Sequence, residues 1–196
     1  MNYLAHLYLS AGSTEALVGG LLGDFVKGPL TPGRYPPRML AAIRLHRRID
    51  SFVDSHPAVM CSRARFAPGF RRYAGILLDL FHDHFLARDW LEHADEPLAR
   101  FSDRAYRAFD HHQALLPPRA RLVTRAMTRD DWLGSYGDPE GIRRALRGLS
   151  RRLSRANPLA AGHAELARDY HALEADFRDL LPAVRAFAGV DADRET

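Results

Sequence analysis

The helical character of the chain is clearest in residues 36–55, which read PPRMLAAIRLHRRIDSFVDS. Paired prolines suit the first turn of a helix, because the first amide groups of a helix need no intrahelical acceptor. Apolar residues then recur at intervals of three and four, and the same stripe carries an imidazole and a carboxylate. The stripe consists of Met39, Ile43, His46, Asp50 and Val53, with Asp54 next to its end. We predict a helix from Pro36 and Pro37 to about Ser55 that turns these polar groups toward the core.

The rest of the chain shows similar helical spacing, and no stretch shows the alternation with β-branched residues that is typical of a sheet. No repeat, low-complexity linker or break in composition divides the sequence. We therefore predict an all-α, single-domain helical bundle over residues 1–196. The other expected helices are about Tyr3 to Ser10, Ser13 or Thr14 to Gly28-Pro29, Ala58 to Phe66, Gly69 to His93, Pro97 to Leu115, Pro118 to Trp132, Asp138 to Ala156, and Gly162 or His163 to Phe187, with a loop from Pro29 to Tyr35.

Length and composition exclude several classes of protein. The chain has 196 residues, of which 46% are hydrophobic and 27% charged, so a disordered tail and a disulfide miniprotein are both excluded. Cys61 is the only cysteine, which rules out an intramolecular disulfide and a zinc site built from thiolates. No apolar run reaches the roughly 18 residues of a membrane helix, and residues 1–10 lack the pattern of a secretory signal. We expect a cytoplasmic protein without a membrane segment.

The positive charge points to an anionic partner. The net charge is +4, and Lys27 is the only lysine, so arginine carries nearly all of the positive charge. An acidic protein, a phosphate and a nucleic acid all fit this balance. Residues 143–155 alone hold six arginines. This segment is either a solvated helix face or a docking surface for an acidic partner, where charge speeds association more than it adds affinity.

Acidic residues also fall on the apolar stripes of two other predicted helices. Asp24 follows Leu17 and Leu21 on one stripe, and Asp79 and Asp83 lie one turn apart on another, which also holds Ile76, Leu86 and Trp90. Ionised carboxylates in the interior cost several kcal/mol each unless a cation is beside them. The cation is arginine, protonated histidine or a divalent metal. Aspartate together with histidine at one-turn spacing favours Mn²⁺, Mg²⁺ or Fe²⁺, and a buried Arg–Asp network is the alternative.

Cations next to these acids suggest phosphoester chemistry. Arg47 and Arg48 follow His46 directly, and Lys27 follows Asp24 closely. A guanidinium group matches two phosphate oxygens, and a metal ion polarises a phosphoryl oxygen and activates a water. The competing interpretation makes the two arginines a solvated or ion-paired face. His82 and Asp83 form an adjacent pair similar to that of the HD phosphohydrolases, although the spacing favours Asp83 alone.

Four blocks of the sequence resemble one enzyme family. They are residues 1–7 (MNYLAHL), 20–28 (GLLGDFVKG), 45–50 (LHRRID) with Asp54, and Leu78-Asp79 with residues 83–86 (DHFL). Together and in this order they are similar to the acyl carrier protein phosphodiesterases, also called acyl carrier protein hydrolases. His82 lies outside the pattern of this family, which makes the chain an atypical relative of the HD phosphohydrolases. The more specific blocks all lie in the first half of the chain.

The resemblance implies an all-α, HD-phosphohydrolase-like fold and a metal-dependent reaction, usually supported by Mn²⁺. The reaction is hydrolysis of the phosphodiester that joins 4′-phosphopantetheine to a serine of holo acyl carrier protein. It releases the apo carrier protein and 4′-phosphopantetheine. The substrate is thus an acidic protein, and no nucleic acid is expected as a partner. Mg²⁺ or another divalent cation is the alternative to Mn²⁺.

The residues and the resemblance together give each candidate a role. A carboxylate acts as general base, for which Asp24 is the candidate, and Arg47 with Arg48 or Lys27 holds the phosphate oxygens. His84 or His6 protonates the leaving serine oxygen. The metal ligands are expected to be Asp24, His46, Asp50, Asp79 and Asp83.

Two other functions remain open from the sequence. The first is a metal phosphohydrolase of the same fold that acts on a nucleotide or another small phosphoester, because a fold permits many substrates. The second is a non-catalytic helical module that binds an acidic protein or a nucleic acid through its arginines.

Overall fold

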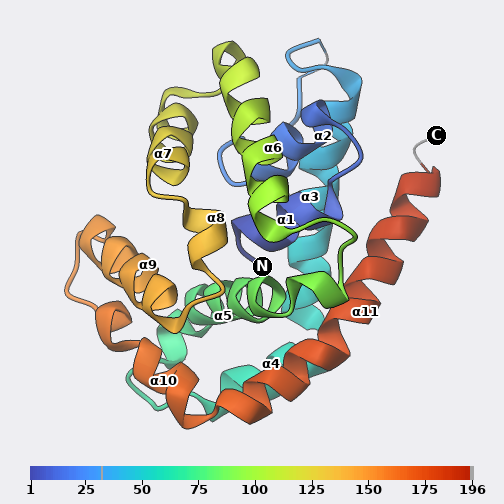
Figure 1. The fold of residues 1–196 in the computed structure, drawn as a ribbon. Helices are drawn as coiled ribbons and strands as arrows, with labels where there is room; N and C mark the ends of the chain where they lie inside the picture. The colour runs from blue at the N-terminus through green and yellow to red at the C-terminus, as the bar shows by residue number, and fades with distance from the viewer. Residues whose placement is uncertain (32, 195–196) are drawn as a thin grey trace.

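A computed structural model of the protein describes residues 1–31 and 33–194, with side chains up to residue 189. Within these ranges the chain forms α-helices and short 3₁₀ turns and no strand (Figure 1), so the all-α prediction is confirmed. None of the described helices has the length and hydropathy of a membrane span. The α-helices are α1 (Tyr3–Leu9), α2 (Thr14–Leu22), α3 (Pro37–Ser55), α4 (Pro57–Arg65), α5 (Ala74–Arg88), α6 (Leu98–His111), α7 (Pro118–Arg129), α8 (Trp132–Ser135), α9 (Pro139–Arg152), α10 (His163–Arg168) and α11 (Tyr170–Arg194).

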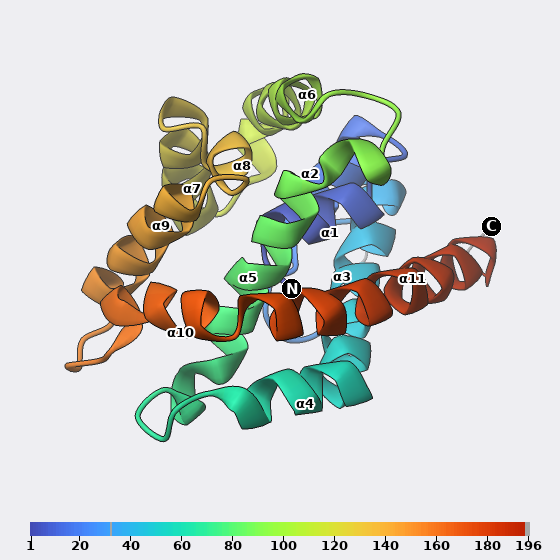
Figure 2. The ribbon, with the colours of Figure 1, turned by 60° about the horizontal axis from the view of Figure 1, so that its bottom comes forward.

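Helix α5 lies across the middle of the molecule (Figure 1), and its second half is packed on all sides. Every residue from Phe81 to Ala87 is buried, because α1, α4, α9 and α11 all contact this helix. Figure 2 shows α11 crossing in front of α5. Side chains from distant parts of the chain, such as Leu4 and Val184, join one hydrophobic core around α5.

Helices α1, α2 and α3 pack together beside α5. As predicted, Ser13 caps α2, and its hydroxyl accepts a hydrogen bond from the amide of Ala16 at 3.1 Å. Helix α3 begins at Pro37, as the paired prolines indicated. Its predicted stripe is largely buried: Met39, Ile43, His46 and Val53 are all inside. This arrangement brings one face of α3 against α1 and the end of α2.

Three predicted helices have other bounds in the structure, and three side chains on or next to the predicted stripes are exposed, namely Asp24, Asp54 and Ile76. Helix α2 ends at Leu22 and not near Gly28, so Asp24 lies in a turn. The helix expected over residues 69–93 is shortened to α5 by flanking 3₁₀ turns, and the last predicted helix is split at Asp169 into α10 and α11. Ile76 was expected on the buried stripe of its helix but is exposed. Asp54 also faces solvent, where it pairs with Arg63.

Candidate metal centre

Two histidines and an aspartate meet where α1 packs on α3. His6 comes from α1, and His46 and Asp50 lie one turn apart on α3. Nε2 of His6 is 3.0 Å from Oδ1 of Asp50, and Nε2 of His46 is 3.2 Å from Oδ2 of the same carboxylate. The two imidazole rings are stacked with 3.6 Å between their centroids. One potential ligand atom from each residue lies within 4.8 Å of the others, so the three side chains can reach one ion.

Two glycines at the end of α2 fix the orientation of His46. Its Nδ1 donates a hydrogen bond to the carbonyl oxygen of Gly20 at 2.6 Å, which turns Nε2 toward Asp50. The backbone of Gly23 packs directly on the ring, since a Cβ at this position would lie only 2.1 Å from Cγ of His46. A backbone acceptor on the far nitrogen is typical of histidines that bind metals. Residues 20 and 23 therefore position the imidazole.

Burial and hydrogen bonding set the charges of this group. Burial lowers the pKa of His6 to about 4, so its imidazole is neutral at pH 7. Burial acts to raise the pKa of Asp50, but hydrogen bonds from His46 and His6 outweigh that effect and hold this pKa well below its usual range. The three side chains thus offer two imidazoles, of which that of His6 is neutral, and one carboxylate, a set that fits a divalent ion such as Mn²⁺.

Two further carboxylates lie at the edge of this group. Oδ1 of Asp24, in the turn after α2, is 3.7 Å from Nε2 of His46. Oδ1 of Asp79, on α5, accepts a hydrogen bond from the amino group of Met1 at 2.7 Å, and that amino group is 3.8 Å from Asp50. Side chains of Asp24, Asp50 and Asp79 are 43%, 42% and 42% exposed, respectively, whereas both histidines are buried. The cluster is therefore closed on its histidine side and open to solvent on its acidic side.

Asp83 does not contact this cluster, although it lies one turn from Asp79. It is fully buried beneath the first turn of α1, where its two oxygens accept hydrogen bonds from the amides of Leu4 and Ala5 at 2.8 and 3.0 Å. These amides have no acceptor within the helix, so the carboxylate supplies one. Burial raises the pKa of Asp83 to about 7 despite the two bonds. The structure places Asp83 under the helix that carries His6.

The neighbouring histidines of α5 also lie apart from the cluster. Nδ1 of His84 donates to the carbonyl of Tyr136, and its Nε2 accepts from the hydroxyl of Tyr170, both at 2.8 Å. His82 is buried with its ring stacked on Phe177. Of the two histidines expected to donate a proton, the structure brings only His6 to the metal-binding group.

The predicted phosphate-binding cations lie on the turn that carries Asp24 or on α3. Arg47 donates to the carbonyls of Gly28 and Val26 at 2.9 and 2.5 Å, so its guanidinium holds this turn. Gly28 has a φ of 75°, a conformation that glycine adopts easily. Lys27 is exposed on the same turn. The guanidinium of Arg48 lies 5.5 Å over the ring of Phe187 on α11.

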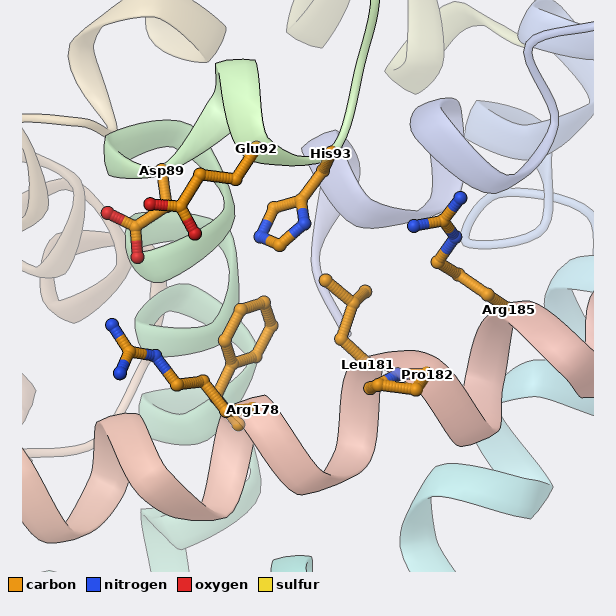
Figure 3. Close-up of a pocket in the computed structure, with 8 residues that line it drawn as sticks. Asp89, Glu92, His93, Arg178, Leu181, Pro182 and Arg185 are labelled. Carbon is orange, nitrogen blue, oxygen red and sulfur yellow. The ribbon is translucent and has the colours of Figure 1, made fainter.

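A cavity of about 380 Å³ lies on another face, between the end of α5 and α11 (Figure 3). Figure 3 shows Asp89, Glu92 and His93 on one wall and Arg178 and Arg185 on the other. None of the residues predicted for the site lines this cavity. Asp89 is already paired with Arg88. The cluster of His6, His46 and Asp50 is therefore the better candidate for a catalytic site.

Comparison with known proteins identifies the family of the chain. The sequence profile described as acyl carrier protein phosphodiesterase matches residues 1–184, which include every residue of the cluster. The chain belongs to the acyl carrier protein phosphodiesterase family. The resemblance seen in the sequence is thus confirmed.

Relatives of this family match nearly the whole chain. Acyl carrier protein phosphodiesterase of Serratia proteamaculans is 38% identical over 183 residues, which cover 93% of this chain and 94% of the relative. The proteins of the same name from Pectobacterium atrosepticum and Salmonella agona are 35% and 37% identical, and each match covers 96% of this chain and 97% of the relative. No solved structure is significantly similar to the protein.

Proposed function

We propose that the protein hydrolyses the phosphodiester between 4′-phosphopantetheine and a serine of holo acyl carrier protein. The products are the apo carrier protein and free 4′-phosphopantetheine. The observation that carries the proposal is the group formed by His6, His46 and Asp50, whose acidic side is open to solvent within a member of this family. A divalent cation, with Mn²⁺ the first choice, is its proposed cofactor.

Hydrolysis forms a bond from a water oxygen to phosphorus and breaks the bond from phosphorus to the serine oxygen. His46, Asp50 and His6 would hold the ion, with Asp24 and Asp79 at its edge. A bound divalent ion supplies polarisation of a phosphoryl oxygen and lowers the pKa of a water. Asp24 is the general base in this proposal, since it is exposed and 3.7 Å from His46. It takes one proton of the attacking water and passes a proton on to the serine oxygen as that oxygen leaves.

Asp83 and Arg47 have positioning roles in this proposal. Asp83 holds the first turn of α1, which carries His6 two residues after Leu4. Arg47 holds the turn that carries Asp24. His84 has no catalytic role here, because both of its nitrogens are engaged by Tyr136 and Tyr170.

The arginines of α9 support an acidic protein as substrate. Arg144, Arg147 and Arg151 are exposed along this helix, and none of them pairs with a carboxylate among the described residues. A positive surface of this kind raises the association rate with an acidic protein and makes it sensitive to salt.

The test is incubation of the purified protein with holo acyl carrier protein and Mn²⁺, with and without EDTA. Mass spectrometry reads the loss of the phosphopantetheine mass from the carrier protein. We expect conversion to the apo mass with Mn²⁺ and none with EDTA. A set of nucleotides and small phosphodiesters is the matched control. Turnover of these, with intact holo carrier protein, would contradict the proposal and favour a small phosphoester as substrate.

A further inference from the structure

Two cavities meet at Tyr3, the first residue of α1. One of about 320 Å³ lies against α8 and α9, and one of about 430 Å³ lies against α7 and α9. Both are lined by Tyr3, Leu149 and Arg152, so they form one groove with two branches, called here the α8 branch and the α7 branch. Each branch has the size of a small-molecule site, about 300–1,000 Å³.

The junction of the two branches lies next to the acids of the candidate centre. Ile76 of the α7 branch and Leu80 of the α8 branch lie one turn apart on one face of α5, and Asp79 directly precedes Leu80 in the chain. Phe25, which follows Asp24 directly, lines the α7 branch. Tyr3 lies close enough to Asp24 and to Arg152 that both charges act on its hydroxyl group. A phosphate at the cluster therefore has the junction as its neighbour.

The α8 branch has the chemistry of a site for an extended, partly polar chain. Its walls combine the ring of Trp132 and the side chains of Leu80 and Leu149 with the amide of Asn2 and the hydroxyl of Ser135. The α7 branch offers only apolar side chains, Tyr3 and two arginines. A helix is about 10–12 Å wide with its side chains, which is too wide for a cavity of 320 Å³. A narrow ligand with amide groups fits the α8 branch better.

Arginine side chains line the groove, and one of them lies at the junction of the two branches. Arg152 lines both branches, and its guanidinium lies 5.1 Å over the ring of Trp132. Arg119 and Arg144 also line the groove, and neither forms an ion pair with any described residue. The guanidinium of Arg152, at the junction, complements a phosphate group.

We propose that the α8 branch binds the pantetheine arm of the substrate, with the phosphate end at Tyr3 and Arg152 and the amide-containing chain along α9 toward Gly148. This inference rests on the proposed function, since that function supplies the arm. In this proposal, residues of α8 and α9 bind the arm and select it. The carrier protein then lies on the other side of the phosphate.

Gly148 allows the groove to be filled without disturbing the fold. It lines the α8 branch, and a Cβ added there meets no atom within 4 Å. Gly189 on α11 is equally open and lies outside the groove. We expect Gly148→Phe to weaken binding of free 4′-phosphopantetheine at least tenfold and to raise KM for holo carrier protein more than it lowers kcat. Gly189→Phe should change neither quantity.

A second pair of variants tests the direction of the arm. Arg152→Gln should weaken binding of 4′-phosphopantetheine several-fold and leave binding of pantetheine, which lacks the phosphate, unchanged. Arg155→Gln, beyond the end of α9, is its control. Equal losses for the two ligands would place the phosphate elsewhere and overturn this orientation.

The outcomes of these experiments distinguish the groove proposal from the proposed function. If the protein hydrolyses holo carrier protein but Gly148→Phe matches Gly189→Phe in KM and in 4′-phosphopantetheine binding, the groove proposal is overturned and the proposed function stands. If the protein binds 4′-phosphopantetheine in a manner that depends on Gly148 yet leaves holo carrier protein intact, the groove proposal is supported and the proposed function fails. If it neither binds nor hydrolyses, both proposals fail.

Discussion

Helices α3 and α5 carry the same kind of sequence pattern and use it in opposite ways. Each places a histidine and an aspartate on a mostly apolar face. On α3, His46 and Asp50 stand beside His6, and the carboxylate is half-exposed at an opening. On α5, His82 and Asp83 are sealed inside, against Phe177 and the amides of α1. The comparison shows that periodicity tells which way a side chain points but not what it meets there.

The largest expected effect separates two aspartates of α3. Asp50→Asn should lower activity on holo carrier protein at least about 100-fold, since even partners of a metal ligand are worth 10–100-fold. Asp54→Asn is the control, because Asp54 is on the same helix, faces solvent and pairs with Arg63. Rate measurements at saturating Mn²⁺ with both variants check this. Equal activities would remove Asp50 from the metal centre.

The next effect concerns Asp83, which we expect to be structural. Asp83→Ala leaves the amides of Leu4 and Ala5 without acceptors, and the free energy of unfolding should fall by roughly 2–3 kcal/mol. Denaturant unfolding measures this loss. Asp83→Asn keeps one acceptor and should lose less. If Asp83→Asn is fully stable yet binds no Mn²⁺, Asp83 is a metal ligand after all and the contrast between the two helices disappears.

A smaller effect tests how closely the position of His46 is defined. A methyl group at residue 23 meets the ring of His46, so Gly23→Ala should displace this imidazole and lower activity about 10–100-fold. Gly12→Ala, where a Cβ meets nothing, is the control. Full activity in Gly23→Ala would show that the ring adjusts without cost.

The smallest effect is a dependence of stability on pH. Burial lowers the pKa of His82 from 6.5 to about 3, so between these pH values the unfolded chain binds a proton that the folded chain does not. The contribution of His82 to the free energy of unfolding is fully present above pH 6.5 and is lost as the pH falls toward 3. We expect His82→Leu to gain about 1–2 kcal/mol relative to the original protein on going from pH 7 to pH 5. Unfolding curves at both pH values, compared as a difference, cancel the steric cost of the substitution, and an equal difference at both would refute the assignment.

The sequence was sufficient for the all-α class and for the α3 stripe, because helical spacing and the proline start are local signals. It failed for Asp24, since α2 ends where Gly23 packs on a ring from another helix, and no local pattern records that contact. It could not separate His82, Asp83 and His84, because residues 81–87 of α5 are buried on every side of the helix. The roles of Gly20 and Gly23 in orienting His46 were also missed, although their three-residue spacing before Asp24 was visible.

Asp83 accepts hydrogen bonds from Leu4 and Ala5, which precede it in the chain by 79 and 78 positions, respectively. This separation has a consequence for folding during synthesis. Helices α1, α2 and α3 leave the ribosome first and contact one another, but α1 cannot be anchored until α5 has followed. Helix α5 in turn keeps apolar surface uncovered until α9 and α11 emerge. Ordering of the metal-binding residues therefore waits for segments synthesised much later, and apolar surface of the nascent chain stays exposed in the interval.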